Sequence, residues 1–253
     1  MPYTQETHHI PHHGRVAEGT LFRPDTDKKM PLVLFCHGYN GRRDSFFPAA
    51  SFLAENGIAC FCLDFCGGAA VDKSGFPTEQ MTLLTEKEDL GAAFSHCAQL
   101  PYADRDNLFL FGESQGGLVS ALFAEEHAQE LNGLILLFPA LCIPDDWRKK
   151  FPQGAPLPES MDFWGMKLGK RFFESACAMQ VFENIGQFDK PVLLLHGDAD
   201  CVVPLSYSRR AEKAYKNAKL VVFDGEGHGF SEQGNEQVRQ LCLRFIRERM
   251  CTN

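Results

Sequence analysis

The chain of 253 residues contains 44% hydrophobic and 23% charged residues, a composition typical of a folded globular domain and not of a disordered chain. Its 25 Lys and Arg residues are outnumbered by 33 Asp and Glu residues, which gives a formal net charge of −8 at pH 7. This acidic balance argues against nucleic acid or an anionic membrane as a partner and favours a small molecule.

The amino terminus, "MPYTQETHHIPHHG", lacks the basic start and apolar centre of a signal peptide, and no apolar run approaches the length of a membrane span. We therefore expect a cytoplasmic protein. Several of the ten cysteines lie inside apolar runs such as "IACFCLDFC", where cysteine behaves as a small hydrophobic residue, and they form no CxxC pairs. We interpret them as reduced thiols without zinc, and a disulfide between two of them stays open.

In chain order, predicted strands alternate with predicted helices. Residues 8–24 predict an antiparallel hairpin at one edge of a sheet. Nearly continuous runs of Val, Leu, Ile and Phe then predict six buried strands, at 32–37, 58–64, 108–112, 134–138, 192–196 and 219–224. Amphipathic patterns predict helices at about 44–56, 81–99, 114–128, 206–217 and 234–249. Strands that are apolar on both faces indicate a mostly parallel sheet with helices on both sides, and thus an α/β fold.

One region, residues 139–182, interrupts this alternation. It contains five prolines and both tryptophans of the chain, and it makes up most of a connection of more than fifty residues between the predicted strands at 134–138 and 192–196. A connection of this length is usually functional, so we expect a cap inserted into a single domain that spans residues 1–253. The alternative is a surface excursion that carries an ordinary helix at 165–179.

The stretch "GESQG", residues 112–116, follows a predicted strand and precedes a predicted helix. In a sharp strand-to-helix turn, Gly112 and Gly116 leave room for the backbone while Ser114 projects from the apex. This context is the one in which a G-x-S-x-G motif presents a nucleophile, so we predict that Ser114 is the catalytic nucleophile.

A serine hydroxyl needs a base and an orienting carboxylate. "GDADCVVP" and "GEGHGF" each follow a predicted strand, and we assign Asp200 as the acid and His228 as the base. Asp198 competes with Asp200 but stands closer to the strand end. His37 and His196 are interpreted as structural residues that hydrogen-bond loop backbone.

The loop "HGYNG" follows the first predicted central strand. We expect it to present the backbone amide of Tyr39, which together with the amide of Gln115 would stabilise a tetrahedral oxyanion. Arg42, Arg43 and Asp44 are expected to cap and solvate the next helix.

The ordered set HGYNG, GESQGG, HGDADCVVP and GEGHGF resembles the α/β-hydrolase superfamily over nearly the whole chain. Residues 75–93 and the insertion after Phe138 are similar to those of small bacterial cinnamoyl and feruloyl esterases. The resemblance implies hydrolysis of a small carboxylic ester through an acyl-enzyme, without a cofactor. Glu113 departs from this group, which often has histidine there.

Residues of the predicted cap are the candidates for substrate binding, by position only: Asp145, Asp146, Trp147, Phe163 and Trp164. The tryptophans could equally hold the cap on the sheet. Other acyl substrates stay open, namely a monoacylglycerol or lysophospholipid, a thioester or a small peptide amide, as does a binding module without turnover. The histidines at positions 8, 9, 12 and 13 are expected to hold no functional metal, and a homodimer stays open.

Overall fold

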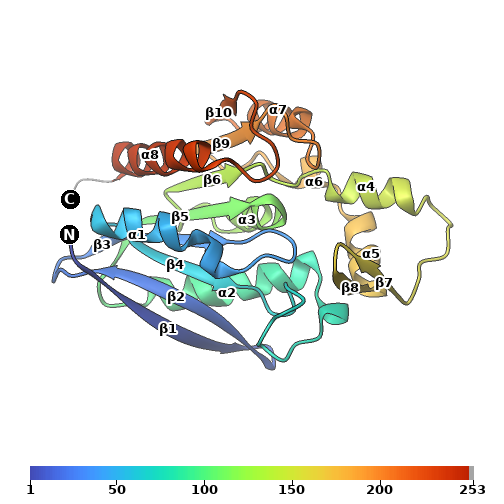
Figure 1. Cartoon of the computed structure of the whole chain (residues 1–253), viewed down its shortest axis with the longest axis horizontal. Coiled ribbons are helices and arrows are strands. Elements are labelled where there is room, and N and C mark those ends of the chain that lie inside the picture. Colours follow the sequence, from blue (N-terminus) through green and yellow to red (C-terminus); the bar gives the residue numbers. More distant parts are fainter. Residues whose placement is uncertain (251–253) are drawn as a thin grey trace.

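The computed structural model describes residues 1–250, and its centre is an eight-stranded sheet in the order β1-β2-β4-β3-β5-β6-β9-β10 (Figure 1). The strands are β1 (Tyr3–His12), β2 (Arg15–Pro24), β3 (Met30–Cys36), β4 (Ala59–Asp64), β5 (Ala103–Glu113), β6 (Gly133–Leu137), β9 (Val192–Gly197) and β10 (Ala218–Phe223). The hairpin β1–β2 is antiparallel and joins β4 in antiparallel fashion, whereas all later pairs are parallel. The prediction of a mostly parallel sheet with a hairpin at one edge is confirmed.

Helices cover both faces of this sheet. The principal ones are η1 (Arg43–Phe46) with α1 (Phe47–Glu55), α2 (Leu83–Ala98), α3 (Ser114–Glu126), α7 (Leu205–Ala214) and α8 (Glu232–Arg249). In β3, Val33 and Phe35 pack in a core shared with α1 and α8, while Leu32 and Leu34 pack in a second core with α2 and α3. Because both faces are buried, the strands read as continuous apolar runs.

The segment between β6 and β9 forms its own small structure beside the sheet, which we call the insertion (Figure 1). Its elements are α4 (Ile143–Lys150), β7 (Ser160–Phe163), β8 (Met166–Gly169), α5 (Lys170–Ala178) and α6 (Val181–Asn184). Apolar side chains of the insertion, such as Leu168 and Phe172, are continuous with the core on the α2 and α3 side of the sheet. The insertion is therefore packed onto the body of the protein.

The predicted helix at 165–179 is wrong in its first part. Trp164 and Gly165 both have positive φ angles, 43° and 78°, and they connect β7 to β8, in which Phe163 pairs with Met166. A two-residue connection with φ above zero at both positions is a tight hairpin turn, so the chain forms a strand before the helix begins at Lys170.

Two further findings concern the same described part of the chain. None of the helices within residues 1–250 is long and apolar enough to cross a bilayer. The nine cysteines of this range are all free thiols, and most are buried. Burial raises the pKa of the Cys36 thiol to about 12, which keeps it protonated and unreactive at neutral pH.

Candidate active site

Ser114 occupies the turn between β5 and α3. Its φ of 51° is unusual for a residue with a side chain, and the turn holds it there because the neighbouring backbone packs tightly. A Cβ atom on Gly112 would lie 2.5 Å from the carbonyl oxygen of Gly116, and one on Gly116 would lie 2.4 Å from the carbonyl oxygens of Cys36 and His37. Only glycine fits at both positions, as expected from the motif.

The side chain of Ser114 begins a hydrogen-bonded chain of three residues. Its Oγ lies 3.0 Å from Nε2 of His228, and Nδ1 of His228 lies 2.8 Å from Oδ2 of Asp200. Since a carboxylate only accepts, Nδ1 carries the proton and Nε2 is free to accept from the serine hydroxyl. The structure thus brings together three residues that lie far apart in the sequence.

Asp200 is suited to remain ionised. Burial would raise the pKa of its carboxyl, but hydrogen bonds from His228 and from the amides of Val203 and Val202 outweigh it and leave the pKa below the ordinary value. A fixed negative charge therefore faces Nδ1 of His228, where it would stabilise an imidazolium.

The competing residues have other hydrogen-bond partners. Asp198 accepts a hydrogen bond from the amide of Gly225. Nε2 of His196 donates to the carbonyl of Val203, and it also lies 3.3 Å from Oδ2 of Asp200, so His196 supports the triad carboxylate from behind. His37 hydrogen-bonds its own loop through the carbonyl of Gly38 and accepts from the amide of Phe65. Both histidines have the structural roles that the sequence indicated.

The loop after β3 approaches the nucleophile closely. A Cβ atom on Gly38 would lie 3.0 Å from Cβ of Ser114, and Tyr39 lines the same pocket as Ser114 and Gln115. The hydroxyl of Tyr39 donates to the carbonyl of Phe163 at 2.7 Å and thereby ties this loop to the insertion. The oxyanion role of the amides of Tyr39 and Gln115 stays a prediction that this arrangement suits.

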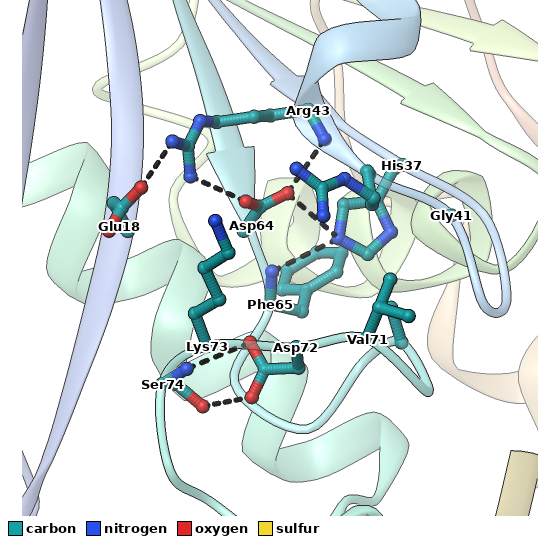
Figure 2. A pocket seen from close by; sticks show the side chains of 12 residues that line it. Glu18, His37, Gly41, Arg43, Asp64, Phe65, Val71, Asp72, Lys73 and Ser74 are labelled. Atoms are coloured by element: carbon teal, nitrogen blue, oxygen red, sulfur yellow. Dashed lines mark hydrogen bonds and ion pairs between the residues drawn. The ribbon is translucent and has the colours of Figure 1, made fainter.

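Charged side chains anchor the other end of that loop (Figure 2). The amide of Arg43 donates to Asp64 at 2.7 Å, and its guanidinium group pairs with both Asp64 and Glu18. The expected capping role of Arg43 is therefore wrong: it links η1 to β4 and β2, and only Arg42 and Asp44 remain at the exposed helix start. Partners on two strands, β2 and β4, hold this end of the loop in place, as an oxyanion site requires.

A pocket of about 130 Å³ opens above Ser114. Aromatic and aliphatic side chains from the insertion form most of its wall, and they include the predicted residues Trp147, Phe163 and Trp164. Asp146 and Lys150 are its charged residues. Asp145 does not line it, because its carboxylate accepts from Tyr207 and pairs with Arg148 on the side of α7.

Trp147 packs inside the insertion and also lines the pocket, and its contact with substrate stays a prediction. It is 5% exposed and packs against Phe163 and Phe173, with ring centroids 5.1 and 4.9 Å away. The ammonium group of Lys150 lies 5.4 Å from the Trp147 ring centroid and 5.5 Å from that of Phe163. The same aromatic cluster holds the insertion together and shapes the pocket.

Glu86 is a residue of this site that the sequence analysis missed. Its two carboxyl oxygens lie 2.8 and 2.9 Å from Nε2 of Gln115, the residue after the nucleophile. It is fully buried in the first turn of α2, and burial raises the pKa of its carboxyl to about 8. A glutamate near the start of a predicted amphipathic helix normally faces solvent, so no local signal identified it.

One histidine of the N-terminal hairpin, His12, belongs to a cluster of a different kind. His12, Cys66 and Asp89 bring potential metal-ligand atoms within 4.8 Å of one another. However, Asp89 already accepts hydrogen bonds from His12, Arg15 and the amide of Cys66, and the Asp89 contact raises the pKa of His12. The carboxylate of Asp89 is thus already engaged by Arg15, His12 and an amide, and a metal ion would have to compete with the proton that Asp89 favours on His12, so this cluster suits a link between β1, β2 and α2.

Comparisons with known proteins agree with this architecture. A family model described as "Serine aminopeptidase, S33" matches residues 27–176, and one described as "TAP-like protein" matches residues 173–250. The solved structure of Est1E from Butyrivibrio proteoclasticus, with ferulic acid bound, is 28% identical, has a TM-score of 0.87, and covers 96% of this chain and 98% of its own. The protein YisY of Bacillus subtilis (strain 168), an AB hydrolase superfamily protein, is 22% identical over 89% of this chain and 95% of its own length. The protein belongs to the serine aminopeptidase S33 family and has the α/β-hydrolase fold.

Proposed function

We propose that the protein is a serine carboxylesterase that hydrolyses small esters through an acyl-enzyme, with hydroxycinnamoyl esters as the preferred class. The observation that carries this proposal is the hydrogen-bonded series Ser114, His228 and Asp200, whose serine lines a pocket with aromatic walls. A nucleophile, a base and an orienting carboxylate in this geometry are suited to acyl transfer.

In the first half of the proposed reaction, Oγ of Ser114 attacks the ester carbonyl as Nε2 of His228 accepts its proton. The amides of Tyr39 and Gln115 stabilise the oxyanion that forms. The carbon–oxygen bond to the alcohol then breaks, and the imidazolium returns the proton to the leaving oxygen. Water repeats the sequence on the acyl-enzyme and releases the acid.

The pocket supports an aromatic acyl group. Its apolar walls include the rings of Trp147, Phe163 and Phe172, against which a flat ring could pack. Lys150 supplies a hydrogen-bond donor that suits a phenolic hydroxyl. The likeness to Est1E, a structure that binds ferulic acid and spans nearly the same length, supports the same substrate class.

An aminopeptidase, the activity in the family's description, would need a partner for the free α-ammonium group of its substrate. The carboxylate that lines this pocket, Asp146, forms an exposed ion pair with Lys149 at 3.5 Å, and the ammonium group of Lys150 stands in the same pocket, where it would repel a second ammonium group. This arrangement favours an uncharged ester over a peptide with a free amino terminus.

Initial rates on a panel of substrates test the proposal: methyl ferulate, methyl p-coumarate, p-nitrophenyl butyrate, a monoacylglycerol and an aminoacyl p-nitroanilide. Ser114→Ala protein serves as the blank. We expect kcat/KM, divided by the uncatalysed hydrolysis rate constant of each substrate, to be about tenfold or more higher for the two hydroxycinnamoyl esters than for the activated butyrate, a difference of about 1.4 kcal/mol in transition-state binding. Preference for the butyrate or the anilide on this measure would overturn the hydroxycinnamoyl assignment.

A further inference from the structure

A second cavity, of about 660 Å³, lies on the other face of the sheet from the substrate pocket. Residues from η1, α1, α8 and the carboxyl ends of β5 and β6 form its wall. It shares no lining residue with the pocket above Ser114. It is therefore a separate space, although Gly229 in its wall directly follows His228.

Glu113 places a carboxyl group in this cavity. Side chains alternate along a strand, so Glu113 lies on the same face of β5 as Phe111, which also lines the cavity. Within residues 1–250 no hydrogen bond or ion pair to this carboxylate is recorded, although the side chain is partly buried. A carboxylate in such a position lacks the partner that buried charges normally have.

The rest of the cavity suits a cation with an apolar surround. Its aromatic wall consists of Phe46, Phe111, Phe138 and Phe230. Their ring faces can attract an organic cation. Glu232 adds a second, exposed carboxylate at the rim.

The positive charge in the cavity wall is already paired. Nε of Arg239, the cationic residue of the wall, donates to Glu236 at 3.0 Å. The cavity as a whole therefore favours positive charge.

We propose that this cavity is a binding site for a small organic ammonium ion with an apolar or aryl substituent, whose positive charge pairs with Glu113. The site lies behind the catalytic residues and not in the substrate pocket. The ring of Phe138 connects the two, since it lines the cavity and its centroid lies 4.6 Å from that of His228. The proposal does not depend on the substrate that Ser114 acts on.

The ionisation of Glu113 gives the site a pH dependence. Burial raises the pKa of this carboxyl to about 7. The other charged groups near it are Glu232 and the Arg239–Glu236 pair, with His228 on the far side of Phe138. Because only the ionised carboxylate attracts a cation, we expect affinity to rise about tenfold between pH 6 and pH 8.

Titration calorimetry with benzyltrimethylammonium tests the proposal on the full chain. We expect saturable binding at pH 8, at least about tenfold weaker binding to Glu113→Gln, and no rise in affinity with pH in that variant. Asp146→Asn, which removes the carboxylate of the substrate pocket, is the matched control and should bind as the unmodified protein does. Benzyl alcohol, which has the ring without the charge, should bind the unmodified protein much more weakly.

Three results would overturn the proposal: no saturable binding at pH 8, equal affinity in Glu113→Gln, or loss of binding in Asp146→Asn alone. The last would place the cation in the substrate pocket. If Glu113→Gln does not fold, two measurements on the unmodified protein decide the matter. Binding of benzyl alcohol as tight as that of benzyltrimethylammonium would contradict a role for the carboxylate, and so would an affinity for the cation that does not change with pH.

Discussion

Replacement of Glu86 by Gln should change how the stability of the protein depends on pH. The carboxyl of Glu86 is fully buried against Gln115, and its pKa in the folded protein is about 8, compared with an ordinary value of 4.5. The folded state therefore holds a proton that the unfolded chain releases above pH 4.5. The stabilisation from this proton is fully present below about pH 4.5 and is lost as the pH rises through about 8.

The size of this change in stability follows from the difference between the pKa of Glu86 in the folded and the unfolded protein. Each unit of pKa corresponds to about 1.4 kcal/mol, so the free energy of unfolding should fall by up to about 4 kcal/mol through this group between pH 5 and pH 9. Glutamine has nearly the same shape, can hydrogen-bond Gln115 and cannot ionise. Glu113, whose pKa is also raised, is present in both proteins and cancels from the comparison.

Urea unfolding of both proteins at pH 5, 7 and 9 measures this difference. We expect the unmodified protein to lose stability relative to Glu86→Gln as the pH rises, with most of the change between pH 5 and pH 7 and little further change above about pH 8. Parallel pH profiles for the two proteins would refute a proton held by Glu86.

Three further changes test the site and the turn that builds it. Asp200→Asn should lower kcat for ester hydrolysis by about 10⁴-fold while the melting temperature stays close to that of the unmodified protein, and activity within about tenfold would contradict its role. Gly116→Ala should lower the free energy of unfolding in urea by about 1 to 3 kcal/mol or more, because the new Cβ would lie 2.4 Å from backbone oxygens. Gly91→Ala in α2 is the control: its Cβ would meet only Phe123 at 3.5 Å, so the change should be neutral or stabilising. Similar urea midpoints for the two variants would contradict the close packing around Gly116. Lys150→Ala should raise KM for methyl p-coumarate about tenfold but leave that for methyl cinnamate nearly unchanged, and equal effects on both esters would show that Lys150 does not contact the phenol.

Much of the fold could be predicted because its signals are local. Strands buried on both faces have a composition of their own, and the sequence around Ser114 needs glycine at two positions for steric reasons that the structure shows directly. The predicted start of β5, residue 108, is too late because the first residues of the strand, 103–107, are largely polar and do not extend the apolar run. Asp200 could be preferred over Asp198 because the loop after a parallel strand must turn before its side chain can reach another loop.

The remaining parts depend on contacts between distant segments. Nothing near Arg43 in the sequence indicates that Asp64 and Glu18 lie within reach of it. Likewise Glu86 contacts Gln115 only because α2 packs against the start of α3. In the insertion, the aromatic residues that line the pocket could be predicted from the sequence. Which of the two acids, Asp145 or Asp146, faces the pocket depends on the orientation of α4. Tyr207 and Arg148 bind the carboxylate of Asp145 and hold it away from the pocket.

The central claim is that Ser114 is a nucleophile activated by His228 and Asp200. Reaction with a fluorophosphonate probe, followed by mass spectrometry of the peptide digest, tests it most directly. We predict a single phosphonyl adduct on Ser114, with labelling abolished in Ser114→Ala and strongly slowed in His228→Ala. No adduct on the folded protein, or an adduct on another residue, would contradict the claim.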